Sequence, residues 1–417
     1  MSGATLNETP SGERVHIGFF GIRNAGKSSV VNAVTGQDLA VVSDVRGTTT
    51  DPVKKAMELL PIGPVVIIDT PGFDDEGALG EKRVERTRKI LAQTDLAILV
   101  TDGTGPLQPA DRELIQIFEE RKLPYLIVRN KADLLPEGTA QSAGPNRAES
   151  PGETDPNTLF VSAVTGAGIH ELKERMGALA KDAKEEKTIL GDLAAAGDTV
   201  VLVIPIDASA PKGRIILPQQ MVLRELLDRH ANALCVQPED LKKALAGLAQ
   251  PPALVVTDSQ AFKLVMRDTP ADIPTTSFSI LMARYKGNLR QQVLGIAALK
   301  NLGEGDKVLI SEGCTHHRQC QDIGTVKIPG WIETCTDGKP EVTFTSGGTF
   351  PQDLSPYRLI IHCGACMLNE KEMLHRLRLA EEQNVPMTNY GVAIAEFNGT
   401  LRRALEPFPE LLELLDG

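Results

Sequence analysis

The sequence has few aromatic residues and no long apolar run. One Trp, four Tyr and eleven Phe among 417 residues argue against a single-strand nucleic-acid platform built from stacked rings. No stretch approaches the ~20 apolar residues that span a bilayer, and the polar segment Met1–Arg14 lacks the apolar core of a signal peptide. These absences predict a cytoplasmic protein without membrane association.

Basic residues are also outnumbered. The chain has 44 Lys and Arg against 55 Asp and Glu, a net charge of −11. Binding of nucleic-acid phosphates over a whole surface requires a basic face, so this balance speaks against a nucleic-acid partner.

The length exceeds the ~250–300 residues at which one hydrophobic core stops growing, so several domains are expected. We expect three domains, at 1–185, 186–275 and 276–417, with a small α/β fold for the second and an α/β fold for the third. The middle segment has no cluster of chemically reactive residues, which favours a structural or oligomerisation role. No internal repeat is evident in the sequence.

The first segment alternates apolar runs with amphipathic stretches, a pattern typical of an α/β fold with a doubly wound, mostly parallel sheet. Its expected strands are Val15–Phe20, Val65–Asp69, Leu96–Val100, Tyr125–Arg129 and Leu159–Val161.

A phosphate-binding loop follows the first expected strand. Gly21-Ile-Arg-Asn-Ala-Gly26-Lys27-Ser28 fits G-x-x-x-x-G-K-[ST] in its required context. The glycines let backbone N–H groups close around phosphates, Lys27 adds a positive charge at the β/γ oxygens, and Ser28 can bind Mg²⁺. The helix that starts here also directs the positive end of its dipole at the phosphates.

Three further motifs follow in the expected order. Asp69-Thr-Pro-Gly72 ends a strand, where Asp69 can hold Mg²⁺ through water and the Gly72 amide can contact the γ-phosphate. Asn130-Lys131-Ala-Asp133 supplies a carboxylate for two guanine N–H groups that adenine does not offer. Ser162-Ala163 lies where GTPases contact the guanine O6. The four motifs together predict a GTP-hydrolysing enzyme. Expected nucleotide contacts are Gly21, Asn24, Ala25, Gly26, Lys27, Ser28, Ser29, Thr49, Asp69, Gly72, Asn130, Lys131, Asp133, Ser162 and Ala163, with Lys27, Thr49, Asp69 and Gly72 as the catalytic set.

Two details resemble the tRNA-modification GTPase group. Gly47-Thr-Thr-Thr-Asp51 is similar to its first switch, which implies that Thr49 joins Ser28 on Mg²⁺, and Asn24 matches the asparagine that helps bind K⁺ there. Phe73 stands where Ras-like proteins carry a water-orienting Gln, and an apolar ring cannot align a water. The acidic residues that follow Phe73, or a K⁺ ion, must take that task, which predicts slow, switch-like hydrolysis.

Five of the six cysteines fall between Cys314 and Cys366. Two further strands are expected at Lys307–Ser311 and Arg358–Ile361. Cys314-Thr-His316 follows the first and His362-Cys363-Gly-Ala-Cys366 the second, so two loops can bring three thiolates and one or two imidazoles to one point of an open sheet. An iron–sulfur cluster, a structural zinc ion and metal-free thiols all remain compatible with this ligand set.

A GTPase of this type, a middle α/β module and a C-terminal C-x-H…H-C-x-x-C together resemble HydF, the [FeFe]-hydrogenase maturation GTPases. The resemblance covers the whole chain in domain order. It implies a [4Fe–4S] cluster on Cys314, Cys363 and Cys366 with an open or exchangeable fourth site. His316 and His362 match the motif histidines and are further candidate metal ligands.

The same resemblance implies a carrier for a two-iron precursor and a dimer or larger homo-oligomer. Its implied partners are the apo-hydrogenase and two radical-SAM maturases. The alternative is a potassium-dependent, RNA-directed GTPase with a structural zinc site.

Overall fold

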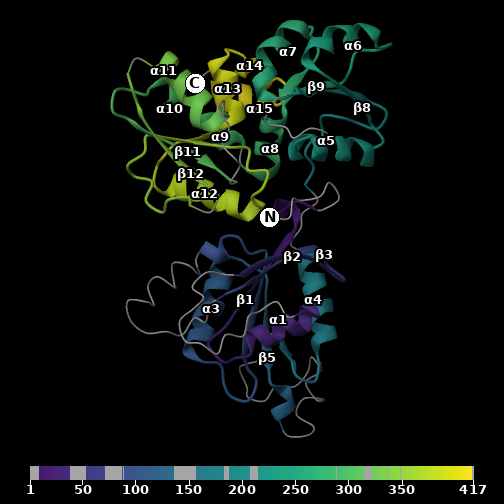
Figure 1. The fold of residues 1–417 in the computed structure, drawn as a ribbon, viewed down its shortest axis with the longest axis vertical. Helices are drawn as coiled ribbons and strands as arrows, with labels where there is room; N and C mark the ends of the chain where they lie inside the picture. The colour runs from purple at the N-terminus through teal and green to yellow at the C-terminus, as the bar shows by residue number, and fades with distance from the viewer. Residues whose placement is uncertain are drawn as a thin grey trace. The chain divides into compact units, whose positions relative to one another are not determined.

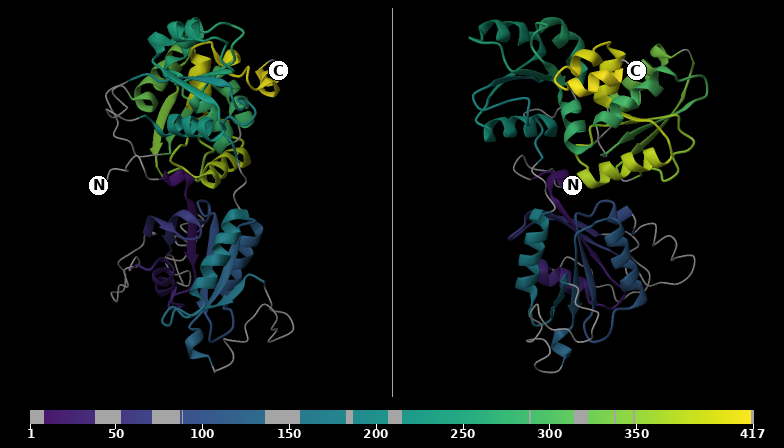
Figure 2. Two further views of the ribbon diagram at one scale, coloured as in Figure 1. Left: turned by 90° about the vertical axis from the view of Figure 1, so that its right-hand side faces the viewer. Right: turned by 180° about the vertical axis from the view of Figure 1, so that it is seen from behind.

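The computed structural model describes residues 9–37, 53–70, 87, 89–135, 156–182, 187–206, 215–287, 289–313, 322–336, 338–347 and 349–415. These residues form two compact units, Met1–Glu185 and Glu186–Gly417 (Figures 1 and 2).

Unit 1 is a six-stranded sheet of order β2-β3-β1-β4-β5-β6, parallel except for the edge strand β2. Helices α1 and α4 cover one face and α3 the other (Figure 1). The strands are β1 (Val15–Phe20), β2 (Val53–Leu59), β3 (Gly63–Asp69), β4 (Leu96–Asp102), β5 (Tyr125–Asn130) and β6 (Thr158–Phe160), and the helices are α1 (Lys27–Thr35), α3 (Pro109–Glu120) and α4 (Ile169–Asp182).

Burial explains which strands the sequence predicts. All six residues of β1 are buried, as are the first six of β4, and both strands are mostly apolar because they lie between two helical layers. Strand β2 is absent from the expected set because its segment mixes lysine and glutamate with apolar residues. It pairs antiparallel with β3 at the edge of the sheet and has no second neighbour among the described strands.

Unit 2 holds two four-stranded parallel sheets. The first has β7 (Thr199–Val203), β8 (Asn232–Val236), β9 (Leu254–Thr257) and β10 (Thr275–Ser277), and the second has β11 (Lys307–Glu312), β12 (Glu341–Ser346), β13 (Leu359–His362) and β14 (Met387–Asn389). The helices are α5 (Leu217–Asp228), α6 (Leu241–Gly247), α7 (Phe262–Asp268), α8 (Phe278–Lys286), α9 (Leu289–Leu294), α10 (Ile296–Lys300), α11 (Ile328–Cys335), α12 (Glu370–Glu382), α13 (Tyr390–Phe397), α14 (Leu401–Ala404) and α15 (Pro409–Leu412).

The two sheets repeat one topology, which the sequence did not reveal. Their orders, β8-β7-β9-β10 and β12-β11-β13-β14, both place the second strand at one edge and the third and fourth on the other side of the first. Each fourth strand runs directly into a helix that its last residue caps: Ser277 accepts from the Ile280 N–H and Asn389 from the Val392 N–H.

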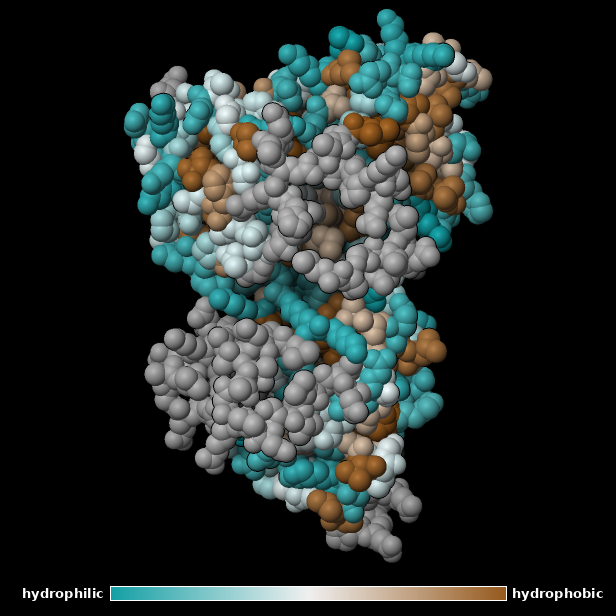
Figure 3. Space-filling view, viewed as in Figure 1, coloured by the Kyte–Doolittle hydropathy of each residue, from teal (hydrophilic) through white to brown (hydrophobic). Residues whose placement is uncertain are grey.

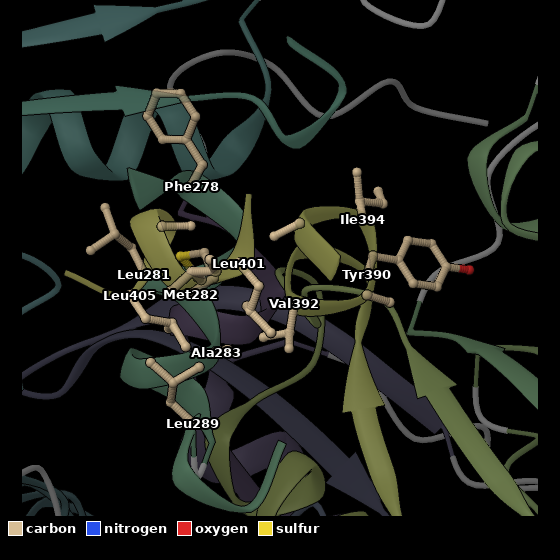
Figure 4. Packing of buried hydrophobic residues seen from close by; sticks show 14 of the residues in the cluster. Phe278, Leu281, Met282, Ala283, Leu289, Tyr390, Val392, Ile394, Leu401 and Leu405 are labelled. Atoms are coloured by element: carbon tan, nitrogen blue, oxygen red, sulfur yellow. The ribbon is translucent and has the colours of Figure 1, made fainter. Parts of the chain in front are cut away.

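Helices α8 and α13 pack against each other through the second residue of each, Ser279 and Gly391. A Cβ on Gly391 would lie 2.6 Å from the Cβ of Ser279, so only glycine fits this approach. Figure 4 shows the buried side chains of both helices, with Leu281 and Met282 from α8 and Val392 and Ile394 from α13 in one cluster.

The expected boundary at 275/276 falls inside β10, which pairs with β9. The two sheets share one continuous hydrophobic core through α8 and α13, and they form a single compact unit. The sequence pattern carries no signal for this shared core.

Candidate functional site

The phosphate-loop residues lie between β1 and α1. Gly26 has φ +84°, and a Cβ on Gly21 would lie 2.2 Å from the Val100 carbonyl oxygen, so both positions require glycine. Helix α1 begins at Lys27, directly after this turn. Its first N–H groups therefore have the orientation that binds phosphate oxygens.

Lys27, Ser28 and Asp69 are brought together, as the motifs predict. The Lys27 ammonium donates to Asp69 Oδ1 at 2.7 Å and also to the Thr70 carbonyl. The Ser28 hydroxyl lies 3.5 Å from the other carboxylate oxygen of Asp69. A cation, a hydroxyl and a carboxylate at one strand end can hold Mg²⁺ and the phosphates of a nucleotide.

The Asn130 side chain connects the phosphate loop to the base-recognition loops. It donates to the Ala25 carbonyl at 3.1 Å and accepts from the Ala163 N–H at 3.1 Å, and it is 3% exposed. The Ser162 hydroxyl donates to Asp133 Oδ1 at 2.6 Å. Asp133 is exposed and can therefore accept hydrogen bonds from a base.

Lys131 has φ +66°, and its ammonium lies 2.6 Å from Asp102 Oδ2 at the end of β4. Hydrogen bonds from Lys131 and Thr104 lower the pKa of Asp102 to about 2. Asn24 and Ser29 are exposed, Asn24 with φ +63°. Thr49 and Gly72 lie outside the described residues.

The second site is at the carboxyl ends of β11 and β13, the point where the strand order of that sheet reverses. Ligands of open parallel sheets bind at such a point. The Cys363 N–H donates to the Ser311 carbonyl at 2.9 Å, which fixes the start of the C-x-x-C loop on β11.

The Cys363 sulfur accepts two backbone N–H groups, from Gly313 at 3.0 Å and from Ala365 at 3.4 Å. Gly313 directly precedes Cys314 in the chain, so the segment that leads into the first expected ligand contacts the second one. Cys314 and His316 themselves lie outside the described residues. No group of three or more metal-ligating side chains occurs within the part of the chain that is described.

His362 has protein partners at both ring nitrogens. Nδ1 lies 2.8 Å from the Cys363 carbonyl oxygen and Nε2 lies 3.0 Å from Arg376 Nη1. A carbonyl can only accept and a guanidinium can only donate, so the ring is the neutral tautomer with its proton on Nδ1. In this arrangement the imidazole, which is fully buried, offers no lone pair to a metal. It orients the Cys363 peptide, in contrast to the ligand role expected from the motif.

Several residues around the cysteines carry no sequence motif and were not expected there. The Tyr390 hydroxyl donates to Glu312 Oε1 at 3.3 Å, and burial together with the charges of Glu312 and Cys363 raises the pKa of Tyr390 well above its usual range. Burial raises the pKa of the Cys366 thiol to about 11; the Cys363 thiol adds to this rise and Lys286 opposes it. Tyr390 begins helix α13, and the sequence signal for the start of this helix is the N-capping residue Asn389 directly before it.

Family models match both units. The 50S ribosome-binding GTPase model matches residues 16–131. The hydrogen maturase F dimerization domain matches 189–287 and the hydrogen maturase F tetramerization domain matches 290–407, together more than half of the chain. The chain belongs to the hydrogen maturase F family. Its domains are those of a hydrogenase-maturation GTPase, and unit 1 is an α/β GTPase domain that hydrolyses GTP.

Relatives outside this family match through the GTPase part. The tRNA modification GTPase MnmE of Nitrosomonas europaea is 35% identical over 181 residues, 43% of this chain and 37% of that protein. MnmE of Xanthomonas euvesicatoria is 38% identical over 167 residues, 40% and 34% of the two chains. The chain spans about a third of the length of these curated relatives. The G domain of the T. maritima FeoB iron transporter is 26% identical, with 40% of this chain and 99% of that chain covered and a TM-score of 0.29.

Among the described residues, no helix combines the length and apolarity needed to cross a membrane.

Proposed function

We propose that this GTPase is a scaffold of hydrogenase maturation that holds a [4Fe–4S] cluster on Cys314, Cys363 and Cys366. The observation that carries the proposal is the pair of N–H groups on the Cys363 sulfur. Hydrogen bonds to cysteine sulfurs are one of the means by which proteins stabilise and tune iron–sulfur clusters. They come here from Gly313 and Ala365, which lie on the two loops that carry the expected ligands.

The donor set fits such a cluster. Thiolates are the ligands that iron–sulfur clusters prefer, and three cysteines leave one iron with an open or exchangeable position. His362 supports the site by holding the Cys363 carbonyl. When bound, the cluster would supply redox chemistry and an iron that can accept a further ligand.

An open iron position is what a carrier requires, because a fully ligated cluster could not accept a second unit. We therefore include in the proposal a two-iron precursor as cargo, the apo-hydrogenase as its recipient and two radical-SAM maturases as partners. The RNA-modification role of the MnmE relatives is not carried over, because those matches cover 43% of this chain or less.

The proposal also includes a K⁺ ion at Asn24 and Mg²⁺ on Ser28 and Thr49. Asn24 is an exposed residue of the phosphate loop, at a point where a carboxamide oxygen could contact a cation beside the phosphates. A monovalent cation there would offset phosphate charge in the transition state.

Homo-oligomers are expected from the dimerization and tetramerization domains of the family models. Among the described strands, β8 has β7 as its only neighbour and is an edge strand of its sheet. Figure 3 shows hydrophobic residues on the side of unit 2 that carries α5 and β8, where Leu227 is 60% exposed. An unpaired strand edge is a ready template for a second chain.

Cys363→Ser tests the cluster site, with Cys335→Ser as a matched control because Cys335 is an exposed cysteine outside the motif. Each full-length variant is reconstituted anaerobically with iron and sulfide, and its iron content and GTP hydrolysis are measured. We expect Cys363→Ser to lose most of its iron with hydrolysis retained, since the GTP site lies in unit 1. Equal iron in the two variants, or zinc in place of iron in the native chain, would overturn the proposal.

A further inference from the structure

Helix α8 ends in a buried lysine. Lys286 is 2% exposed, although lysine is almost never fully buried unless its charge is compensated. The Ser277 side chain caps the start of the helix, and Gly287 is the residue that follows its last turn. Because the cap fixes the first residue of the helix, the length of the helix fixes the position of the Lys286 backbone at its other end.

The Lys286 ammonium contacts the C-x-x-C loop. It donates to the Cys366 carbonyl at 3.2 Å and to the Leu368 carbonyl at 2.9 Å, about eighty residues further along the chain. Lys286 also lines a small hollow together with Cys363 and Gly364. A positive charge is thus held beside the backbone of one expected ligand and near the side chain of another.

The charge acts on the thiols as well as on the backbone. The ammonium lies at the Cys366 backbone, in the hollow that Cys363 also lines, and therefore attracts negative charge on the sulfurs. The same attraction applies to any anionic group held by these sulfurs, and burial limits its screening by solvent. Net charge and hydrogen bonding around a cluster are among the factors that set its reduction potential.

We propose that Lys286 is a positioning residue that fixes the C-x-x-C loop and that its charge favours the reduced, more negative state of the bound cluster. This inference rests on the proposed cluster site. A purely structural lysine is the competing explanation, because a cation in the last turn of a helix also stabilises the helix. The two explanations differ in whether the reduction potential depends on the charge.

Three substitutions separate charge from packing. Lys286→Arg keeps the charge, Lys286→Gln keeps donors for the carbonyls without the charge, and Lys286→Met removes both. Arg403→Met is the matched control, because Arg403 also clamps backbone carbonyls of unit 2, those of Met266, Thr269 and Pro270. This residue is not part of the cysteine site.

Each full-length variant is reconstituted anaerobically, and three quantities are measured: iron per chain, midpoint potential by EPR-monitored redox titration, and unfolding of the iron-free protein. In Lys286→Gln and Lys286→Met we expect at least a tenfold shift of the redox equilibrium toward the oxidised cluster, about 59 mV for one electron. Lys286→Arg restores the native potential. Arg403→Met lowers stability without changing the potential.

The outcomes are distinguishable. A native midpoint potential in both Lys286→Gln and Lys286→Met overturns the proposal. If these two variants fail to fold while Lys286→Arg folds, the lysine is structural and the proposal is also overturned. Iron lost from both neutral variants but kept by Lys286→Arg supports it, and iron lost from all three overturns it. If the native chain itself binds no iron, the proposed cluster site fails, and not the role of the lysine alone.

Discussion

Arg376 is the largest fully buried side chain of the described residues, and removing its charge should strongly destabilise unit 2. Its guanidinium pairs with Glu372 Oε1, donates to His362 Nε2 at 3.0 Å, and lies 5.0 Å from the centre of the Phe350 ring. Arg376→Leu would leave the Glu372 carboxylate, 9% exposed, without its ion pair. Removal of one partner from a buried ion pair costs about 3–5 kcal/mol.

Trp331 provides a specific assay for this loss. It is the single tryptophan of the chain, it lies in unit 2, and its ring is 5.9 Å from that of Phe397. Its fluorescence in urea therefore reports on unit 2, which matters because a chain of two units need not unfold in one step. With an m-value of about 3 kcal/mol/M, the midpoint should fall by at least about 1 M.

Arg224→Leu is the matched control, because Arg224 pairs with Asp228 four residues away on a helix but is 76% exposed. Its loss should cost less than about 0.5 kcal/mol. The double variant Glu372→Leu/Arg376→Leu should regain part of the stability, because it leaves no buried charge unpaired. An Arg376→Leu free energy of unfolding within about 1 kcal/mol of the native value would refute the reasoning.

Two further predictions concern the GTP site. Asp133→Asn should reduce GTP affinity by about 10²–10⁴-fold and shift the preference to a purine that has a carbonyl in place of the exocyclic amine of guanine. The reason is that a carboxamide N–H donates where the carboxylate accepts. Competition binding measures the preference, and an unchanged preference for guanine contradicts the prediction. Replacing K⁺ with Na⁺ should slow GTP hydrolysis in the native chain, and Asn24→Ala should remove the difference. Equal rates in the native chain would eliminate the role given to Asn24.

The GTPase site was predictable because its residues lie in four contiguous motifs at strand ends. The motifs assign Lys27 and Asp69 to the phosphates and Mg²⁺, and Asp133 and Ser162 to the base; the structure places the two members of each pair in contact. Unit 2 was less predictable. Its strands β10 and β14 are three-residue segments rich in Thr, Ser and Asn, without the apolar run by which strands are recognised.

The duplicated topology escaped sequence inspection because no internal repeat is evident in the sequence. Lys286 could not be assigned to the cysteine loop because the contact spans eighty residues. His362 was expected near the metal from its place in the motif, and only its contacts with Cys363 and Arg376 reveal its positioning role.

The proposed function requires that the cysteine site of this GTPase holds an iron–sulfur cluster. The most direct test is the metal and sulfide content of the full-length chain, purified and reconstituted without oxygen. We expect about four iron and four acid-labile sulfide atoms per chain, with an EPR signal on reduction. One zinc ion per chain, with neither iron nor sulfide, would contradict it.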